Sequence, residues 1–364
     1  MARALERWDR EGVPDDPQRW LVRVAHNAAF DAIRRDERLT ALPAGHDAEE
    51  VAPPTLDDEL RLMFLCCHPS LPRAAQVALT LKVACGFTAA HIAGAFLSEE
   101  KTVAQRIARA KQRLRQDGAR FELPEPDELP ARLDPILDVL YLVFGEGHSP
   151  TDGEVAIKDE LCGEALRLAR LLTEIPCTAT PTAQALRALF CFQSSRAAAR
   201  TADDGSLLLL HEQDRDRWDA ALIAEGFACL ARAGRGDALT RFHLEAGIAA
   251  CHAAAASYHA TDWPRIVTLY DLLRAGSPSP IVEVNRAVAT GMASGAVAGL
   301  DELDAIPERD LIERYPYALA AYAELHTSLG QLDEARAYLT RALGCQQARV
   351  QRRLLERKLA ALER

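Results

Sequence analysis

Six side chains in one short stretch of the sequence carry hydrogen-bond donors or positive charge at helical spacing. They are Lys101, Thr102, Gln105, Arg106, Arg109 and Arg113. At the rotation of an α-helix they fall within an arc of about 140°, and we call them the donor strip. Arg and Gln hydrogen-bond base edges, Lys and Arg neutralise phosphates, and Thr offers a hydroxyl and a methyl group. The chemistry that the donor strip suits is the reading of a DNA major groove.

Apolar residues occupy the other side of the same helix. They are Val103, Ile107, Ala110 and Leu114. Their spacing of three and four residues predicts a face that packs on a core and leaves the donor strip outside. An ordinary solvated amphipathic helix is the alternative interpretation of this pattern.

The residues before the donor strip predict another helix and a turn. Thr88 can cap a first helix, Phe96-Leu97 can make the turn, and Ser98 can cap the second helix. Glu99 and Glu100 suit the positive end of that second helix. Two helices joined by a short capped turn are the signature of a helix-turn-helix, which favours the DNA interpretation.

The charge distribution agrees with a local anion-binding surface. The 364 residues carry a net charge of -10, which on average repels nucleic acid. Between Lys82 and Arg120, however, eight basic residues stand against three acidic ones. A basic island in an acidic chain indicates a dedicated surface for an anionic partner, although a run of charge is often only solvated.

The whole chain is predicted to be all-α. Alanine-rich segments with apolar residues three and four apart dominate, runs of β-branched residues are few, and Asn-Gly hairpin signals are absent. Prolines interrupt the pattern at 39–55 and 121–135. We expect an N-terminal piece at 1–38, a linker at 39–55, a module at 56–120, a second linker at 121–135 and a helical region at 136–364.

One segment of the C-terminal region, residues 322–343, is similar to the second half of a tetratricopeptide repeat. Gly330 is expected at the turn between helices, Ala335 and Ala342 where helices approach closely, and Tyr338 in the groove. Thirty-five residues earlier, the equivalent positions are Gly295, Leu300 and Leu303. The repeats are clearest at 285–345. Plain helical packing and a peptide-binding concave face are both compatible with this pattern.

Residues 60–116 resemble region 4 of the sigma-70 family of RNA polymerase sigma factors. Ile92-Ala93, Thr102-Val103 and Arg109-Ala110-Lys111 stand in the family's order. The segments RLMFLCCHPSLPRAAQVALTLK, LYLVFGEGHS, HEQDRDRWDAALIAEG and TDWPRIVTLYDLL are similar to an extracytoplasmic-function group with a C-terminal, tetratricopeptide-like extension. The resemblance implies promoter DNA and core RNA polymerase as partners, with the donor strip on the minus-thirty-five element.

Residues 17–35 resemble regions 2.3 and 2.4 of the same family, which engage the minus-ten element. The resemblance implies that Asn27, Arg34 and Arg35 bind the opened non-template strand. Family members normally begin with further helices that bind the polymerase clamp, whereas the first residues here resemble the end of region 2.2. Two explanations are open: a translation start further upstream, or a shortened protein.

Other sites are less well supported by the sequence. The nine cysteines form no CxxC pair, which argues against a disulfide framework or a zinc ribbon, and Cys66-Cys67 followed by His68 fits buried packing better than metal binding. His252, His259 and Asp262 are a weak metal candidate. No HExxH, nucleophile elbow, P-loop or GxGxxG motif is present, so we predict no enzyme activity, metal or cofactor.

Two functions follow as hypotheses. The first is a cytoplasmic promoter-specificity subunit in which the extension regulates by contacting polymerase, another regulatory protein or the chain's own region 4. The second is a one-component DNA-binding regulator whose helical repeats sense a ligand or peptide. Neither involves a membrane, because the sequence has no apolar run long enough to span one and no signal peptide.

Overall fold

The computed structural model describes residues 56–95, 98–119, 124–125, 128–150, 158–202, 205–345 and 349–362. Over these residues the fold is all-helical, as predicted, and the only pairing of extended backbone is an isolated bridge between Thr201 and Leu207. The chain divides into two compact units, 1–142 and 143–364. None of the described helices is long and apolar enough to cross a bilayer.

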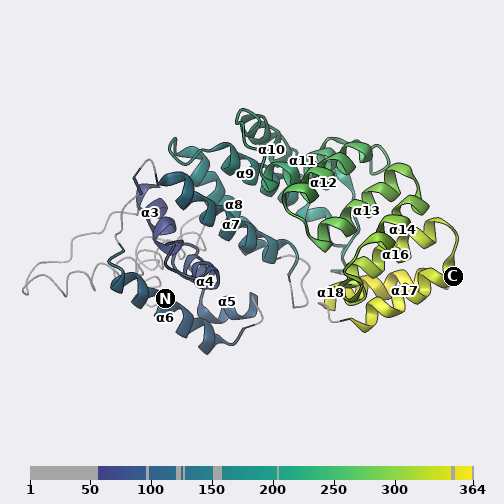
Figure 1. The fold of residues 1–364 in the computed structure, drawn as a ribbon, viewed down its shortest axis with the longest axis horizontal. Coiled ribbons are helices and arrows are strands. Elements are labelled where there is room, and N and C mark those ends of the chain that lie inside the picture. Colours follow the sequence, from purple (N-terminus) through teal and green to yellow (C-terminus); the bar gives the residue numbers. More distant parts are fainter. Residues whose placement is uncertain are drawn as a thin grey trace, which may run out of the picture. The chain divides into compact units, whose positions relative to one another are not determined.

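The described part of the first unit contains four helices before the division and the first part of a fifth. They are α3 (Leu56–Cys66), α4 (Arg73–Val83), α5 (Ala89–Ala95), α6 (Glu100–Gln116) and α7 (Leu129–His148), shown in purple and blue in Figure 1. α4 packs on α3, α5 and α6, and α5 packs on α6. Phe64, Met63 and Leu81 are almost completely buried among these helices. The hydrophobic spacing of the sequence thus produces a small helical core that supports α6.

α7 begins earlier than the prolines of the sequence predict. Pro130 lies in its first turn, where an N–H would have no partner within the helix. Pro135 lies inside the helix, and its carbonyl oxygen accepts a hydrogen bond of 2.8 Å from Arg73 of α4. The expectation that 121–135 interrupts the helical pattern is therefore wrong for residues from Leu129 onward. The division between the two units falls inside α7.

Polar contacts join α7 to α3 and α4. Arg73 also forms an ion pair with Asp138, and Arg132 donates to the carbonyl oxygen of Phe64 at 3.3 Å. Ile136 and Leu137 of α7 are buried. The first part of α7 is consequently an integral member of the first unit.

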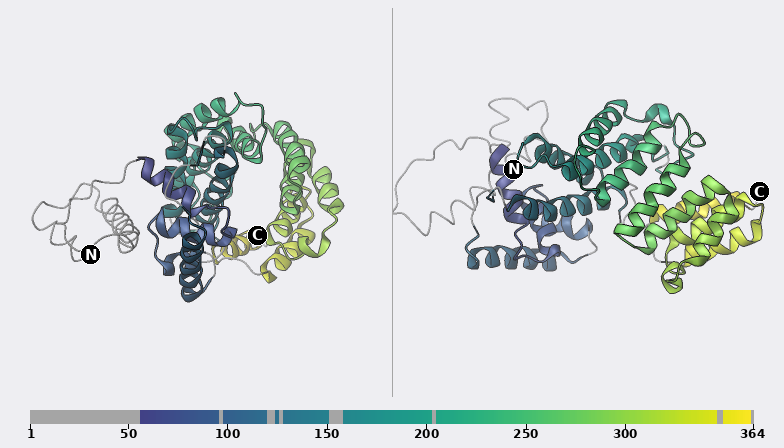
Figure 2. Two further views of the ribbon diagram at one scale, coloured as in Figure 1. Left: turned by 60° about the vertical axis from the view of Figure 1, so that its left-hand side comes forward. Right: turned by 45° about the horizontal axis from the view of Figure 1, so that its top comes forward.

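The second unit is a succession of helices, each packed mainly on its neighbours along the chain (Figure 2). After α7 come α8 (Asp159–Glu174), α9 (Pro181–Ser195), the short helices η1 (Ala197–Ala199) and η2 (Arg215–Arg217), α10 (Ala220–Ala233), α11 (Arg241–Ala254), α12 (Trp263–Gly276), α13 (Pro280–Ser294), α14 (Ala296–Ala305), α15 (Arg309–Ile312), α16 (Pro316–Ser328), α17 (Leu332–Gly344) and α18 (Arg349–Ala361). Contacts between sequential helices are typical of repeat architectures.

Two glycines lie in turns between helices, as the sequence predicts. Gly330 has a φ of 75° in the turn between α16 and α17, and Gly295 has a φ of 102° between α13 and α14. Both conformations are readily reached only by glycine. Ala335 and Ala342 are fully buried against α16, and the Tyr338 ring stacks on Tyr322 with 4.6 Å between centroids.

Candidate nucleic-acid interface

α6 presents one buried face and one outward face. The buried side chains are Val103, Ile107, Ala110 and Leu114. These are the four residues that the helical spacing assigns to the core, and they pack against α4 and α5. Because this face is fixed, the orientation of the opposite face is fixed as well.

The donor strip occupies the outward face. Lys101, Thr102, Gln105, Arg109 and Arg113 are exposed, and Arg106 is half-buried. Arg106 stands at the edge of the arc that adjoins the apolar face, which explains its lower exposure. The structure therefore leaves the guanidinium and amide groups of the strip on the surface of the first unit.

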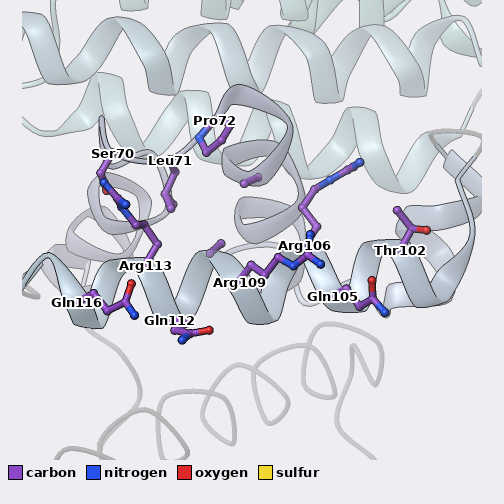
Figure 3. Close-up of a pocket in the computed structure, with 12 residues that line it drawn as sticks. Ser70, Leu71, Pro72, Thr102, Gln105, Arg106, Arg109, Gln112, Arg113 and Gln116 are labelled. Carbon is purple, nitrogen blue, oxygen red and sulfur yellow. The ribbon is translucent and has the colours of Figure 1, made fainter.

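A hollow of about 560 Å³ runs along α6 beside the turn that precedes α4. Its lining from the donor strip is Thr102, Gln105, Arg106, Arg109 and Arg113, and Lys101 lies outside it. Figure 3 shows Arg113 extending toward Ser70 and Leu71, whereas Gln105 and Gln112 point to the other side of the helix. The donor strip therefore presents hydrogen-bond donors on two adjoining sides of α6.

Two further residues of this face, Gln112 and Gln116, were missed in the sequence-based prediction. Both are exposed and both line the hollow. On a wheel that starts at Lys101 they fall at about 20° and 60°, inside the arc of the donor strip. The helical wheel was therefore a sufficient signal. The lining residues Ser70 and Pro72 come from another element and gave no such signal.

Arg113 is held by an acidic neighbour at the end of α6. Its Nε donates to Asp117 Oδ2 at 2.8 Å, and both groups lie at the surface. A hydrogen bond from Ser70 and this contact with Arg113 hold the pKa of Asp117 below its ordinary value. A phosphate that binds Arg113 must compete with this carboxylate, but exposed ion pairs of this kind are weak.

The cap of α6 differs from the prediction. The first helix begins directly after Thr88, as expected, but α6 begins at Glu100 with Glu99 in the N-cap position, so the prediction that Ser98 caps it is wrong. The N–H of Ser98 donates to the carbonyl oxygen of Ala93 at 3.0 Å, which ties Ser98 to the end of α5. Glu100 lies in the first turn, where the helix dipole favours a negative charge.

The other candidate positions are resolved to different extents. Asn27, Arg34 and Arg35 lie outside the described residues. Cys66 and Cys67 are buried, as predicted, and burial raises the pKa of Cys67 to about 12. Among the described residues no group of three or more His, Cys, Asp or Glu side chains is arranged to hold a metal ion.

The weak metal candidate in the second unit is not assembled on one helix. His252 lies in α11, His259 follows the end of that helix, and Asp262 caps α12 by accepting from the N–H of Arg265 at 3.1 Å. Burial, with smaller effects from Arg196 and Arg215, lowers the pKa of His252 to about 4. The two histidines therefore do not share a helix face.

Comparison with known families identifies the module that contains this interface. Residues 61–114 match the family model "Sigma-70, region 4". Over these residues the chain contains a sigma-70 region 4 domain. Within its region 4, α5 and α6 form the helix-turn-helix, and the matched segment ends at Leu114, the last buried residue of α6.

The rest of the chain has relatives without a stated function. Residues 132–234 match "Family of unknown function (DUF6596)". "Uncharacterized protein R00370" of Rhizobium meliloti (strain 1021) is 38% identical over 353 residues, which covers 94% of this chain and 83% of that protein. At that identity and coverage the chain belongs to the same family as this protein. No solved structure matches the chain.

Proposed function

We propose that this chain is an extracytoplasmic-function sigma factor that binds the minus-thirty-five promoter element through α6, in the cytoplasm and together with core RNA polymerase. The observation that carries this proposal is the donor strip, exposed on a helix whose other face is fixed in the core of region 4. The match of residues 61–114 to sigma-70 region 4 supports promoter DNA as the duplex.

The donor strip suits the two tasks of such a helix. Gln105 and Arg109 are exposed near its centre, where they can reach base edges in a major groove. Lys101 and Arg113 lie toward its two ends, where the phosphate backbones pass a helix that enters the groove. No chemical step is assigned to this chain, because polymerase carries out the synthesis. Asn27, Arg34 and Arg35 are proposed to bind the minus-ten element on the family resemblance alone.

The C-terminal unit is proposed to regulate region 4. Its hairpins α13–α14 and α16–α17, with glycines at positive φ, support a tetratricopeptide-like architecture. Repeat units of this kind bind other proteins on extended surfaces. Core polymerase, a separate regulatory protein and the chain's own region 4 are the proposed partners.

Transcription from a selected promoter tests the proposal. Duplexes bound by the full chain are enriched from a random library, and the chain is then added to core polymerase on a template that carries the enriched sequence. We expect specific transcripts and competition with another sigma factor for core polymerase. Specific DNA binding without any affinity for polymerase would favour the one-component regulator instead.

The regulatory part needs a truncation that preserves region 4. A cut at Leu133 would remove most of α7, and with it the hydrogen bond between Arg73 of α4 and the Pro135 carbonyl and the ion pair between Arg73 and Asp138. The chain should end after Ser149, so that the whole of α7 is kept. Transcript levels equal to those of the full chain would contradict a regulatory extension.

A further inference from the structure

Three arginines gather in the second unit with no acidic partner among the residues that the structure describes. Arg196 follows the last residue of α9, Arg200 follows η1, and Arg215 begins η2, which packs against η1. Arg200 is only 8% exposed, and the other two are half-buried. We call these three residues the arginine cluster.

Two members of the cluster donate to the ends of helices. Arg200 Nη1 donates to the carbonyl oxygen of His148 at 2.6 Å and to its Nδ1 at 2.8 Å, at the end of α7. Arg215 Nη1 donates to the carbonyl oxygens of His252 and Ala255, both at 2.7 Å, at the end of α11. These bonds use one nitrogen of each guanidinium.

The third member has a neutral partner. Arg196 donates from Nε and Nη2 to the side-chain oxygen of Gln193, at 3.2 and 2.5 Å. Within the described residues, no carboxylate forms an ion pair with any of the three guanidinium groups. By contrast, the half-buried Arg187 of the same unit forms an ion pair with Glu225.

Helix ends compensate only part of this charge. The C-terminus of a helix carries about half a negative elementary charge, and the ends of α7, α9 and α11 face the cluster. Three such ends offset roughly half of three positive charges. Buried charges are normally paired, because leaving them unpaired in a poorly solvated site costs free energy.

Burial and mutual repulsion lower the pKa values of basic groups at the arginine cluster. Burial, together with the charges of Arg200 and Arg215, lowers the pKa of Arg196 to about 9, and burial lowers that of Arg200 to about 10. Burial and the two neighbouring arginines hold the pKa of His148 well below its ordinary value. Lowered pKa values of basic groups are expected at a site that lacks negative charge.

Two nitrogen atoms at the arginine cluster lack hydrogen-bond partners among the described residues. Arg215 Nη2 is buried and has no hydrogen-bond partner among the described residues, and the same is true of His252 Nδ1. Buried polar atoms without partners are uncommon and call for an explanation such as a bound ion. Guanidinium groups match the oxygens of carboxylates and phosphates in geometry as well as charge.

We propose that the arginine cluster is a binding site for a small oxyanion, namely the carboxylate or phosphate group of a small molecule. Near-complete burial of Arg200 favours a small ligand over a peptide or nucleic acid. The site lies in the unit that follows region 4, so it does not depend on the DNA-binding function proposed above. A bound anion supplies the missing charge and accepts from the unused nitrogens.

The test is anion binding by the full chain. Thermal unfolding and titration calorimetry are recorded at pH 7 with inorganic phosphate and with succinate, each against sodium chloride of equal ionic strength. We expect at least one of the two anions to raise the melting temperature beyond the chloride control, and the arm that responds identifies the phosphate or the carboxylate as the ligand. No response to either anion would overturn the proposal.

Matched variants separate binding from folding. Arg196→Gln is expected to weaken anion binding about tenfold or more. It should leave the melting temperature in anion-free buffer unchanged or higher, because repulsion is removed. Arg187 lies in α9, the helix that Arg196 follows, and is paired with Glu225. Arg187→Gln is therefore expected to lower the melting temperature and keep the anion affinity. A purely structural role for Arg196 predicts instead that Arg196→Gln lowers the melting temperature and keeps the anion affinity.

Two further controls complete the test. Arg215→Lys keeps the charge but loses the planar fork, so it should weaken binding even if the Arg196 variant does not fold. The double variant Arg106→Gln/Arg109→Gln removes donors from α6, and an anion response that disappears with it belongs to region 4 and overturns the proposal.

Discussion

Replacing Arg109 with alanine tests the orientation of α6 most directly. Its side chain is exposed, lines the hollow and lies at about 80° on the wheel, in the middle of the donor strip. Arg and Ala have similarly high helix propensities, so the helix should persist. The stability of the chain should therefore change little, and the effect should appear in DNA binding.

The expected magnitude depends on what Arg109 contacts. A lost bidentate contact with a base costs about 1–3 kcal/mol, which is roughly a five- to 150-fold loss of affinity for the selected promoter. A lost phosphate contact instead lowers the slope of log K against log salt by about 0.9 and weakens all sequences alike. Fluorescence anisotropy with the selected duplex and a scrambled duplex at several salt concentrations distinguishes the two.

Arg115→Ala is the matched control. It removes the same charge from the same helix, but Arg115 falls at about 320° on the wheel and does not line the hollow. We expect it to change affinity much less than Arg109→Ala and to leave specificity intact. Equal losses for both variants would show that net charge alone drives binding, and would refute the assignment of the donor strip to base reading.

Three other predictions concern stability. Leu114→Ala removes a buried side chain from α6 and should lower the free energy of unfolding by about 2 kcal/mol, near the low end for such changes, as urea denaturation can measure. Gly330→Ala should cost about 1 kcal/mol because φ is 75° there, whereas Gly163→Ala in α8, where an added Cβ meets nothing within 4 Å, should leave the melting temperature equal or higher. Hydrogen bonds from Arg170 and Arg187 lower the pKa of Glu225 from 4.5 to about 2. The stabilisation of the fold by ionised Glu225 is therefore complete above about pH 4.5 and is lost as the pH falls toward 2. Glu225→Gln should flatten this part of the pH profile of the free energy of unfolding, measured with urea.

The sequence was a good guide to α6 because the relevant information is local. The spacing of Val103, Ile107, Ala110 and Leu114 defines a buried face, and the donor strip follows as its complement. The same holds for Gly295 and Gly330, because a glycine before a helical pattern marks a turn. Helix boundaries were predicted less well: Ser98 was expected to cap α6, but its N–H donates to the carbonyl oxygen of Ala93 and Glu99 lies in the N-cap position.

Prolines misled the prediction for a physical reason. Pro130 and Pro135 argue against a helix when only local propensity is considered. In the folded unit, Arg73 binds the Pro135 carbonyl, and Ile136 and Leu137 are buried, which favours the helix despite the prolines. Tertiary packing therefore outweighed propensity in α7.

Composition and helical periodicity alone determined the helical class, the face of α6 that reaches solvent and the turns of the repeats, because each depends on residues only a few positions apart. The arginine cluster could be found only in the tertiary structure. Three alanines lie between Arg196 and Arg200, and Arg215 follows fifteen residues later, so the spacing predicts no common site. That these guanidinium groups lack carboxylate partners among the described residues becomes evident only when η1, η2 and the ends of α7 and α11 come together. Burial and charge balance are properties of that arrangement, so no local pattern encodes them.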